Sequence, residues 1–113
     1  MLEYLVKTLR EATGLPVRPF ATHEIEPCLV YKYSTDSDNG SRTTDLLELR
    51  IIAFDIEQLL AIDKKVRKAL LSKGDGTGRI THVGMNGGGV LEERNSQTIH
   101  KFDYYYITYK SEV

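Results

Sequence analysis

The C-terminal segment Ile99–Lys110, with the sequence IHKFDYYYITYK, limits the fold of this chain more than any other stretch. Its aromatic and β-branched residues are typical of a strand, and a strand with one face in water alternates apolar and polar side chains. This segment does not alternate, so large side chains point to both faces. One face receives Tyr105, Ile107 and Tyr109, and the other receives Phe102, Tyr104 and Tyr106.

The length and composition predict one globular domain, residues 1–113, with one modest core. Of the 113 residues, 41% are hydrophobic and 27% are charged, which is ordinary for a soluble protein. No apolar run approaches the ~18 residues of a membrane span, and no signal-peptide pattern is evident, so we expect synthesis in the cytoplasm and no membrane partner. The single cysteine, Cys28, excludes an internal disulfide and is expected to be buried in a strand.

The charge balance argues against a nucleic-acid-binding domain, because such domains normally carry a basic excess or a basic face. The formal net charge is −1. The basic cluster DKKVRKALLSK falls in the second half of a predicted helix, where Lys and Arg favourably meet the negative end of the helix dipole. We therefore interpret it as a solvated helix face.

Two segments have helical periodicity. Apolar residues recur at helical spacing from Leu2 to Ala12, and Gly14 followed by a proline predicts the end of that helix. Asp55 is placed as the N-cap of a second helix of about 16 residues, and Gln58 completes a pattern like a capping box.

The remaining segments predict an antiparallel sheet. Residues 28–34 and 46–54 form a long hairpin around the polar segment Thr35–Asp45, which we expect to be a flexible tip. A strand at 79–85 and the final strand form a second hairpin, and the proline-rich connector at 16–27 offers room for a short edge strand. The predicted fold is α+β, with the order α-β-β-α-β-β, about four antiparallel strands, and two helices on one face.

No sequence pattern predicts a catalytic, cofactor-binding or metal site, so we expect a protein that is not an enzyme and has no cofactor. The glycine-rich runs at 74–78 and 86–89 lack the strand–loop–helix context of a phosphate loop. No paired carboxylates stand out in an apolar setting. The histidines are His23, His82 and His100, and a spatial cluster of the last two on neighbouring strands remains open.

Two helices can cover one face of such a sheet but not both, so the other aromatic face predicts an interaction surface. The sequence leaves open which face forms subunit contacts. The candidates are Phe102, Tyr104 and Tyr106 on one face and Tyr105 and Tyr109 on the other.

The order of elements resembles that of small bacteriophage tail-terminator and tail-completion proteins. The resemblance rests on the helix LVKTLREATG, on the strand Leu49–Asp55 followed by the helical pattern Leu59–Leu70, and on the final hairpin ending in KFDYYYITY. It spans nearly the whole chain. It implies a virion protein that caps the tail tube as a homo-oligomeric ring, typically of six subunits, and joins it to the head connector or stopper protein. It also implies that DNA is only passing cargo and that no catalytic residue exists.

The resemblance and the polar composition together suggest that the hairpin tip is a flexible docking loop. Its candidate residues are Asp36, Asp38, Asn39, Gly40 and Arg42. Three alternatives remain: a head-side neck or stopper protein of the same assembly, a small ligand-binding or enzymatic domain that uses His82 or His100, and an RNA-binding domain that stacks bases on sheet aromatics.

Overall fold

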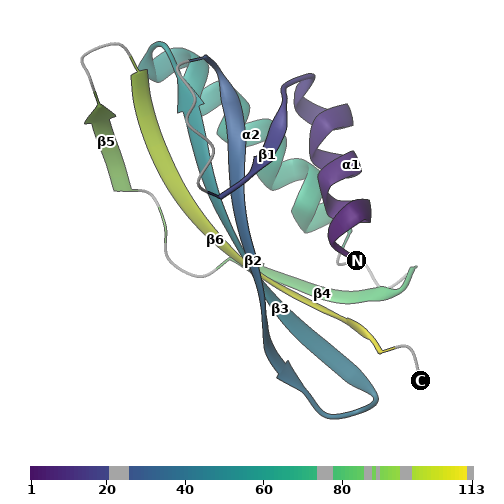
Figure 1. Ribbon diagram of the computed structural model, residues 1–113. Coiled ribbons are helices and arrows are strands. Elements are labelled where there is room, and N and C mark those ends of the chain that lie inside the picture. Colours follow the sequence, from purple (N-terminus) through teal and green to yellow (C-terminus); the bar gives the residue numbers. More distant parts are fainter. Residues whose placement is uncertain (21–25, 74–77, 86–87, 89, 95–97, 112–113) are drawn as a thin grey trace.

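The computed structural model describes residues 1–20, 26–73, 78–85, 88, 90–94 and 98–111 (Figure 1). Helices α1 (Leu2–Thr13) and α2 (Ile56–Ser72) pack on one face of a 6-stranded sheet. The strand order is β1-β2-β3-β6-β4, and β5 also pairs with β6. The strands are β1 (Val17–Pro19), β2 (Cys28–Asp38), β3 (Arg42–Ala53), β4 (Ile80–Met85), β5 (Val90–Arg94) and β6 (Thr98–Lys110).

The structure confirms the α+β fold with both helices on one face. The sheet is antiparallel except for β1, which pairs in parallel with β2 and is the expected short edge strand. The sheet has more strands than the four antiparallel strands expected, because this short edge strand forms and because two strands, β4 and β5, share one edge of β6.

The helix boundaries follow the capping residues that the sequence indicates. Gly14 adopts the left-handed conformation with φ 68°, and its N–H donates to the Arg10 carbonyl at 2.8 Å. At the start of α2 the Asp55 carboxylate accepts from the Gln58 N–H, and the Gln58 side chain accepts from the Phe54 N–H, both at 2.8 Å. Both predicted ends are therefore confirmed.

The core lies between the two helices and the inner face of the sheet, which we define as the face that meets them. The central strands β3 and β6 send every second side chain into this layer. The buried members include Leu5 and Leu9 of α1, Leu59, Val66 and Leu70 of α2, Leu47, Leu49 and Ile51 of β3, and Tyr105 and Ile107 of β6. A smaller buried group, made of Cys28, Val30 and Ile52, lies on the outer face and includes the cysteine that was expected to be buried.

The strands of the hairpin, β2 and β3, extend further into the polar segment 35–45 than the predicted bounds 28–34 and 46–54. Strand pairing continues to Asp38 and Arg42, with a bulge between Thr35 and Ser37. The turn is therefore short, and its Asn39 side chain accepts from the Ser41 and Arg42 N–H groups at 3.1 and 2.8 Å. Polar residues in this segment form strands because β6 pairs with β3 along its whole length and supports the hairpin.

The edge of β6 changes partner near Gly88. Met85 pairs with Tyr105, whereas Val90 pairs with Phe102, so four residues on one side stand opposite two on the other. Gly88 has φ 93° and passes close to the backbone of β6. Its neighbours at 86, 87 and 89, the run at 74–77 and the turn expected near Asn95 lie outside the described residues.

Replacement of Gly88 by alanine should destabilise the fold. A Cβ atom there would lie 2.7 Å from the Phe102 carbonyl oxygen and 2.9 Å from the Asp103 Cα, in a backbone conformation that side chains disfavour. We expect Gly88→Ala to lower the free energy of unfolding by about 1–3 kcal/mol, measured by urea denaturation. The control Gly78→Ala, with no atom within 4 Å of its added Cβ, should stay within about 0.5 kcal/mol of the parent.

Candidate functional site

The outer face of the sheet, opposite the helices, carries half-buried aromatic side chains in the central strands. Phe102 lies opposite Arg50, Tyr104 opposite Glu48, and Tyr106 opposite Leu46. Each of these side chains keeps part of its surface accessible. No described helix covers this face, because the helices pack against the inner one (Figure 1).

Charged groups interleave with these aromatic side chains. The Arg50 guanidinium lies 4.8 Å from the centre of the Phe102 ring, and Lys32 Nζ lies 5.5 Å from the Phe20 ring. Lys32 also approaches Glu48, at 3.9 Å between Nζ and Oε2. Together with Tyr104 and Val30 these residues line a hollow of about 180 Å³. The outer face is therefore a mixed aromatic and charged surface, less apolar than the sequence suggested.

The structure separates the five aromatic residues predicted at subunit contacts. Phe102, Tyr104 and Tyr106 lie on the outer face. Tyr105 is 0% exposed and belongs to the core of its own subunit, so it is unsuited to contact another chain. Tyr109 lies on the inner face, partly buried against the core.

Tyr109 takes part in a polar cluster near the end of the sheet. Its hydroxyl donates to Asp45 Oδ2 at 2.8 Å, and the Tyr33 hydroxyl donates to the same oxygen. Burial raises the pKa of Tyr33, and the hydrogen bond to Asp45 raises that pKa further. Arg79 stacks on Tyr109 with its guanidinium carbon 4.9 Å from the ring centre. These contacts tie β2, β3, β6 and the start of β4 together where the hairpin extends.

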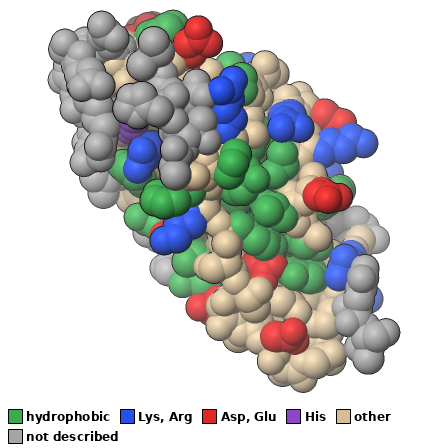
Figure 2. Space-filling view, viewed as in Figure 1, with side chains coloured by type: hydrophobic (Ala, Val, Ile, Leu, Met, Phe, Trp, Pro, Cys, Tyr) green, Lys and Arg blue, Asp and Glu red, His purple; other side chains and the backbone are tan. Residues whose placement is uncertain are grey.

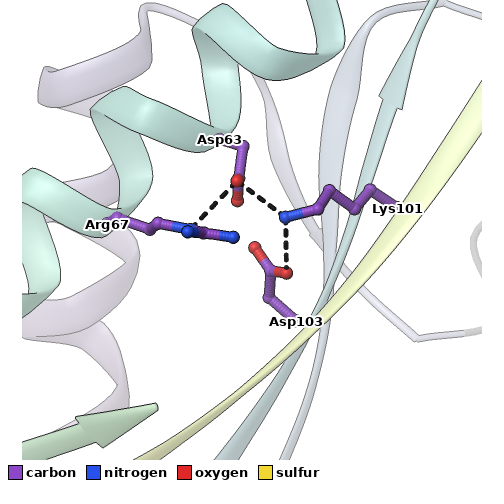
Figure 3. Close-up of polar contacts among 4 residues, drawn as sticks. All are labelled: Asp63, Arg67, Lys101 and Asp103. Carbon is purple, nitrogen blue, oxygen red and sulfur yellow. Dashed lines mark hydrogen bonds and ion pairs between the residues drawn. The ribbon is translucent and has the colours of Figure 1, made fainter. Parts of the chain in front are cut away.

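A second polar cluster lies inside the core, where α2 meets β6 (Figure 3). Lys101 Nζ contacts Asp63 Oδ2 at 2.7 Å and Asp103 Oδ1 at 3.1 Å, and Arg67 Nε contacts Asp63 Oδ2 at 3.0 Å. Asp63, Lys101 and Asp103 are all buried, and Asp103 is 0% exposed. We call these four residues the buried charge cluster.

The buried charge cluster corrects the expectation that no paired carboxylates occupy an apolar setting. A signal was present, because Asp63 interrupts the apolar stripe of α2 and because Lys101 and Asp103 share the alternation of Tyr105 and Ile107. Burial, together with the Asp63 carboxylate, raises the pKa of Asp103 to about 6, whereas Lys101 opposes that rise. Burial also acts to raise the pKa of Asp63, but Asp103, Lys101 and Arg67 outweigh it and the pKa falls.

This arrangement fixes the position of α2 on the sheet. The carboxylate oxygens of Asp103 and Asp63 are enclosed by α2 and β6, away from the hollow on the outer face. A substrate has no access to them in this conformation. We therefore interpret the cluster as structural, because its ion pairs favour one position of α2 on β6 over others.

The histidines do not come together. His82 is exposed on β4 opposite Thr108, whereas His100 is buried on β6 opposite Ile52, eight positions away along the strand. The cluster of His82 and His100 that the sequence left open is therefore absent. Among the described residues, no group of His, Cys, Asp and Glu could hold a metal ion. His23 lies outside the described residues.

The predicted docking residues all lie at the end of the long hairpin. Asp36 and Asp38 belong to β2, Arg42 begins β3, and Asn39 and Gly40 form the turn. Figure 2 shows hydrophobic side chains through the middle of the molecule, whereas the lower, hairpin end shows acidic groups and few hydrophobic side chains.

The fold, but not the sequence, matches a known protein. No family model matches the chain, and no curated protein sequence matches it. Among solved structures it is similar to a chain described as "Virion of native gene transfer agent (GTA) particle", with a TM-score of 0.67 and 10% sequence identity. The match covers 95% of this chain and 92% of that chain. The protein therefore shares the fold of a component of a phage-like virion. No described helix is long and apolar enough to cross a membrane.

Substitution of Asp103 should change how stability depends on pH. Its folded pKa of about 6 exceeds the unfolded value of about 3.9, so its contribution is fully present below about pH 4 and is lost as the pH rises through 6. We expect the free energy of unfolding of the parent, minus that of Asp103→Asn, to fall by on the order of 2 kcal/mol between pH 4 and pH 7. Urea denaturation at several pH values measures this, with Asp36→Asn as the control for removal of a charge. A difference that rises with pH would contradict the assignment.

Removal of the ammonium group should be more damaging than removal of an exposed one. Lys101→Met leaves two buried carboxylates without their shared partner, which typically costs about 3–5 kcal/mol. Lys65→Met, on the exposed side of α2, should change the free energy of unfolding by less than about 0.5 kcal/mol. Thermal and urea denaturation of both variants provide the measurement, and equal losses would contradict a structural role for the cluster.

Proposed function

We propose that this protein is a structural subunit of a phage-like virion that caps or completes the tail tube and joins it to the head connector. In this role it forms a homo-oligomeric ring, of six subunits in the assembled tail, and acts by docking rather than by catalysis. The observation that carries the proposal is the fold shared, over nearly the full length of both chains, with a component of a gene transfer agent virion.

The shape of the subunit supports an assembly role. The molecule measures 47 × 24 × 22 Å, and the hairpin of β2 and β3 projects beyond the helices (Figure 1). An arm of this kind can reach a neighbouring subunit or the adjoining tail component while the helices and core stay intact.

The outer face supports subunit contact through its composition. Protein interfaces are enriched in aromatic side chains and arginine, and Arg50 over the Phe102 ring, with Tyr104 nearby on the same face, provides this combination. Burial of this face against a neighbour would complete the cover that the two helices cannot supply. Because Phe102, Tyr104 and Tyr106 are partly accessible on this face, we assign them to the subunit interface. Tyr105 is buried and belongs to the core.

The charge distribution suits a ring through which DNA passes. The net charge is −1, and exposed Asp36 and Asp38 lie on the projecting hairpin. A weakly negative surface avoids the strong phosphate binding of a basic channel. DNA is then cargo that passes through the ring, and the docking partners are the tail tube protein and the head connector or stopper protein.

Removal of two aromatic side chains from the outer face should abolish capping. We expect Tyr104→Ala with Tyr106→Ala to leave a folded subunit that no longer forms rings on tail tubes, because the contact surface loses its aromatic anchors. Native mass spectrometry and negative-stain imaging, with tail tubes and with head connectors, measure assembly. The control Tyr4→Ala with Leu71→Ala removes side chains that are 47% and 44% exposed on the helices and should still assemble.

The same images separate the two places in the particle. Rings on tube ends support a tail terminator, whereas rings that bind only the connector support a head-side neck protein. A double variant of the outer face that still forms rings would contradict the proposed contact surface.

A further inference from the structure

At the end where the hairpin projects, no described strand borders the two outer edges of the sheet. β1 pairs only with Leu29–Tyr31 of β2, so no described strand borders β2 from Lys32 to Asp38. On the opposite side, no described strand borders the outer edge of β4, Ile80–Met85. Figure 1 shows both edges at the same end of the molecule.

The edge of β2 that no described strand borders presents backbone groups that can bond to another strand. Leu29 donates to the Pro16 carbonyl and Tyr31 accepts from the Phe20 N–H, so the backbone groups of these alternate residues point to the edge. The alternation continues along the strand and aims the N–H groups of Tyr33 and Thr35 the same way, up to the bulge. Such a row of bonding groups is a template for pairing with another strand.

The two outer edges are aligned with each other when the strand pairing is followed across the sheet, and we call this alignment level register. Through β3 and β6, Tyr33 lies in one row with Met85, Thr35 with Val83, Ser37 with His82, and Asp38 with Ile80. Both edges carry a register shift at neighbouring levels, between Thr35 and Ser37 on β2 and, one row further along, between Ile80 and His82 on β4. A bulge usually keeps an edge from pairing, because it adds local twist. Here the two shifts lie on either side of the row that holds Ser37 and His82, so the extra twist falls close together on the two edges.

We propose that β4 of one copy pairs with β2 of the next copy, so that the sheet continues from subunit to subunit. Three successive antiparallel pairings make β2 antiparallel to β4 within one subunit. A neighbour related by a head-to-tail operation keeps this direction, so β4 meets the neighbouring β2 as an antiparallel partner in level register. Head-to-tail contacts of this kind close into a ring when the rotation permits.

The charges favour pairing of the β4 edge with the β2 edge of a neighbour over pairing of two β2 edges. The β2 edge ends in the exposed carboxylates of Asp36 and Asp38, whereas Arg79 precedes β4 and His82 lies on it. In level register Ile80 of one copy lies opposite Asp38 of the next, which places Arg79 one residue further along the strand. A twofold pairing of β2 with β2 would instead bring like charges together. The inference rests on the proposed function, and it adds a contact between the edges of neighbouring subunits to the proposed contact through the outer face.

A disulfide test with mixed variants distinguishes the two pairings. In a Cys28→Ser background, Ser37→Cys and His82→Cys proteins are mixed, assembled on tail tubes and also concentrated alone, and then oxidised. We expect a cross-link between the unlike variants, because opposing residues of antiparallel strands approach within disulfide range. The mixture of Lys7→Cys with Ser37→Cys should give none. Cross-linking of either variant only with itself would overturn the proposal.

Hydrogen exchange supplies a test that does not depend on the register. On assembly the amides of Tyr33 and Thr35 should exchange at least about tenfold more slowly, because they gain partners. Rings that cap tubes without this protection and without the cross-link would overturn the edge pairing while the capping function stands. Cross-links without capping would contradict the proposed function and leave the edge pairing supported. Absence of cross-link and protection in every preparation would overturn the edge pairing.

Discussion

The geometry of a pleated strand is the constraint on which this structure depends. Successive side chains of β6 point to opposite faces, and the two helices cover only the inner one. Tyr105 and Ile107 enter the core on the covered face, while Phe102, Tyr104 and Tyr106 remain half-buried on the other. The aromatic residues of β6 therefore divide into those that pack in the core and those that stay accessible on the outer face. The accessible ones are the strongest candidates for contact between subunits.

The polar clusters of the inner face show how the covered half achieves a single arrangement. Hydrophobic contact alone is not directional, so a helix can slide on a sheet without large loss. The carboxylates of Asp63 and Asp103 and the ammonium of Lys101 require one position of α2. At the other end of the sheet, Asp45 receives two tyrosine hydroxyls and holds the base of the projecting hairpin. A rigid subunit with a supported arm follows from these two clusters, and such rigidity lowers the cost of ordering on assembly.

Much of the fold could be predicted from the sequence, because its signals are local. Helix periodicity, the Asp55 cap and the Gly14 stop define both helices, and the two-residue period of a strand shows which side chains of β3 and β6 share a face. The strands of the hairpin are longer than the sequence predicts, because Thr35 of β2 pairs with β3 and Thr43 of β3 pairs with β6, and no local pattern indicates these partners. The buried charge cluster joins residues 38 positions apart, and no local pattern shows that Lys101 meets Asp63. The contact role of Tyr105 was an open alternative that only its burial removes.

The central claim is that the outer sheet face is covered by another chain in the assembled particle. Hydroxyl-radical labelling with mass spectrometry tests it directly, because solvent-accessible aromatic side chains react and covered ones do not. The account predicts that labelling of Phe102, Tyr104 and Tyr106 falls several-fold when the protein is bound at the end of tail tubes, while labelling of Tyr4 on α1 is unchanged. Equal labelling of the three outer-face aromatics in the free and bound protein would contradict it.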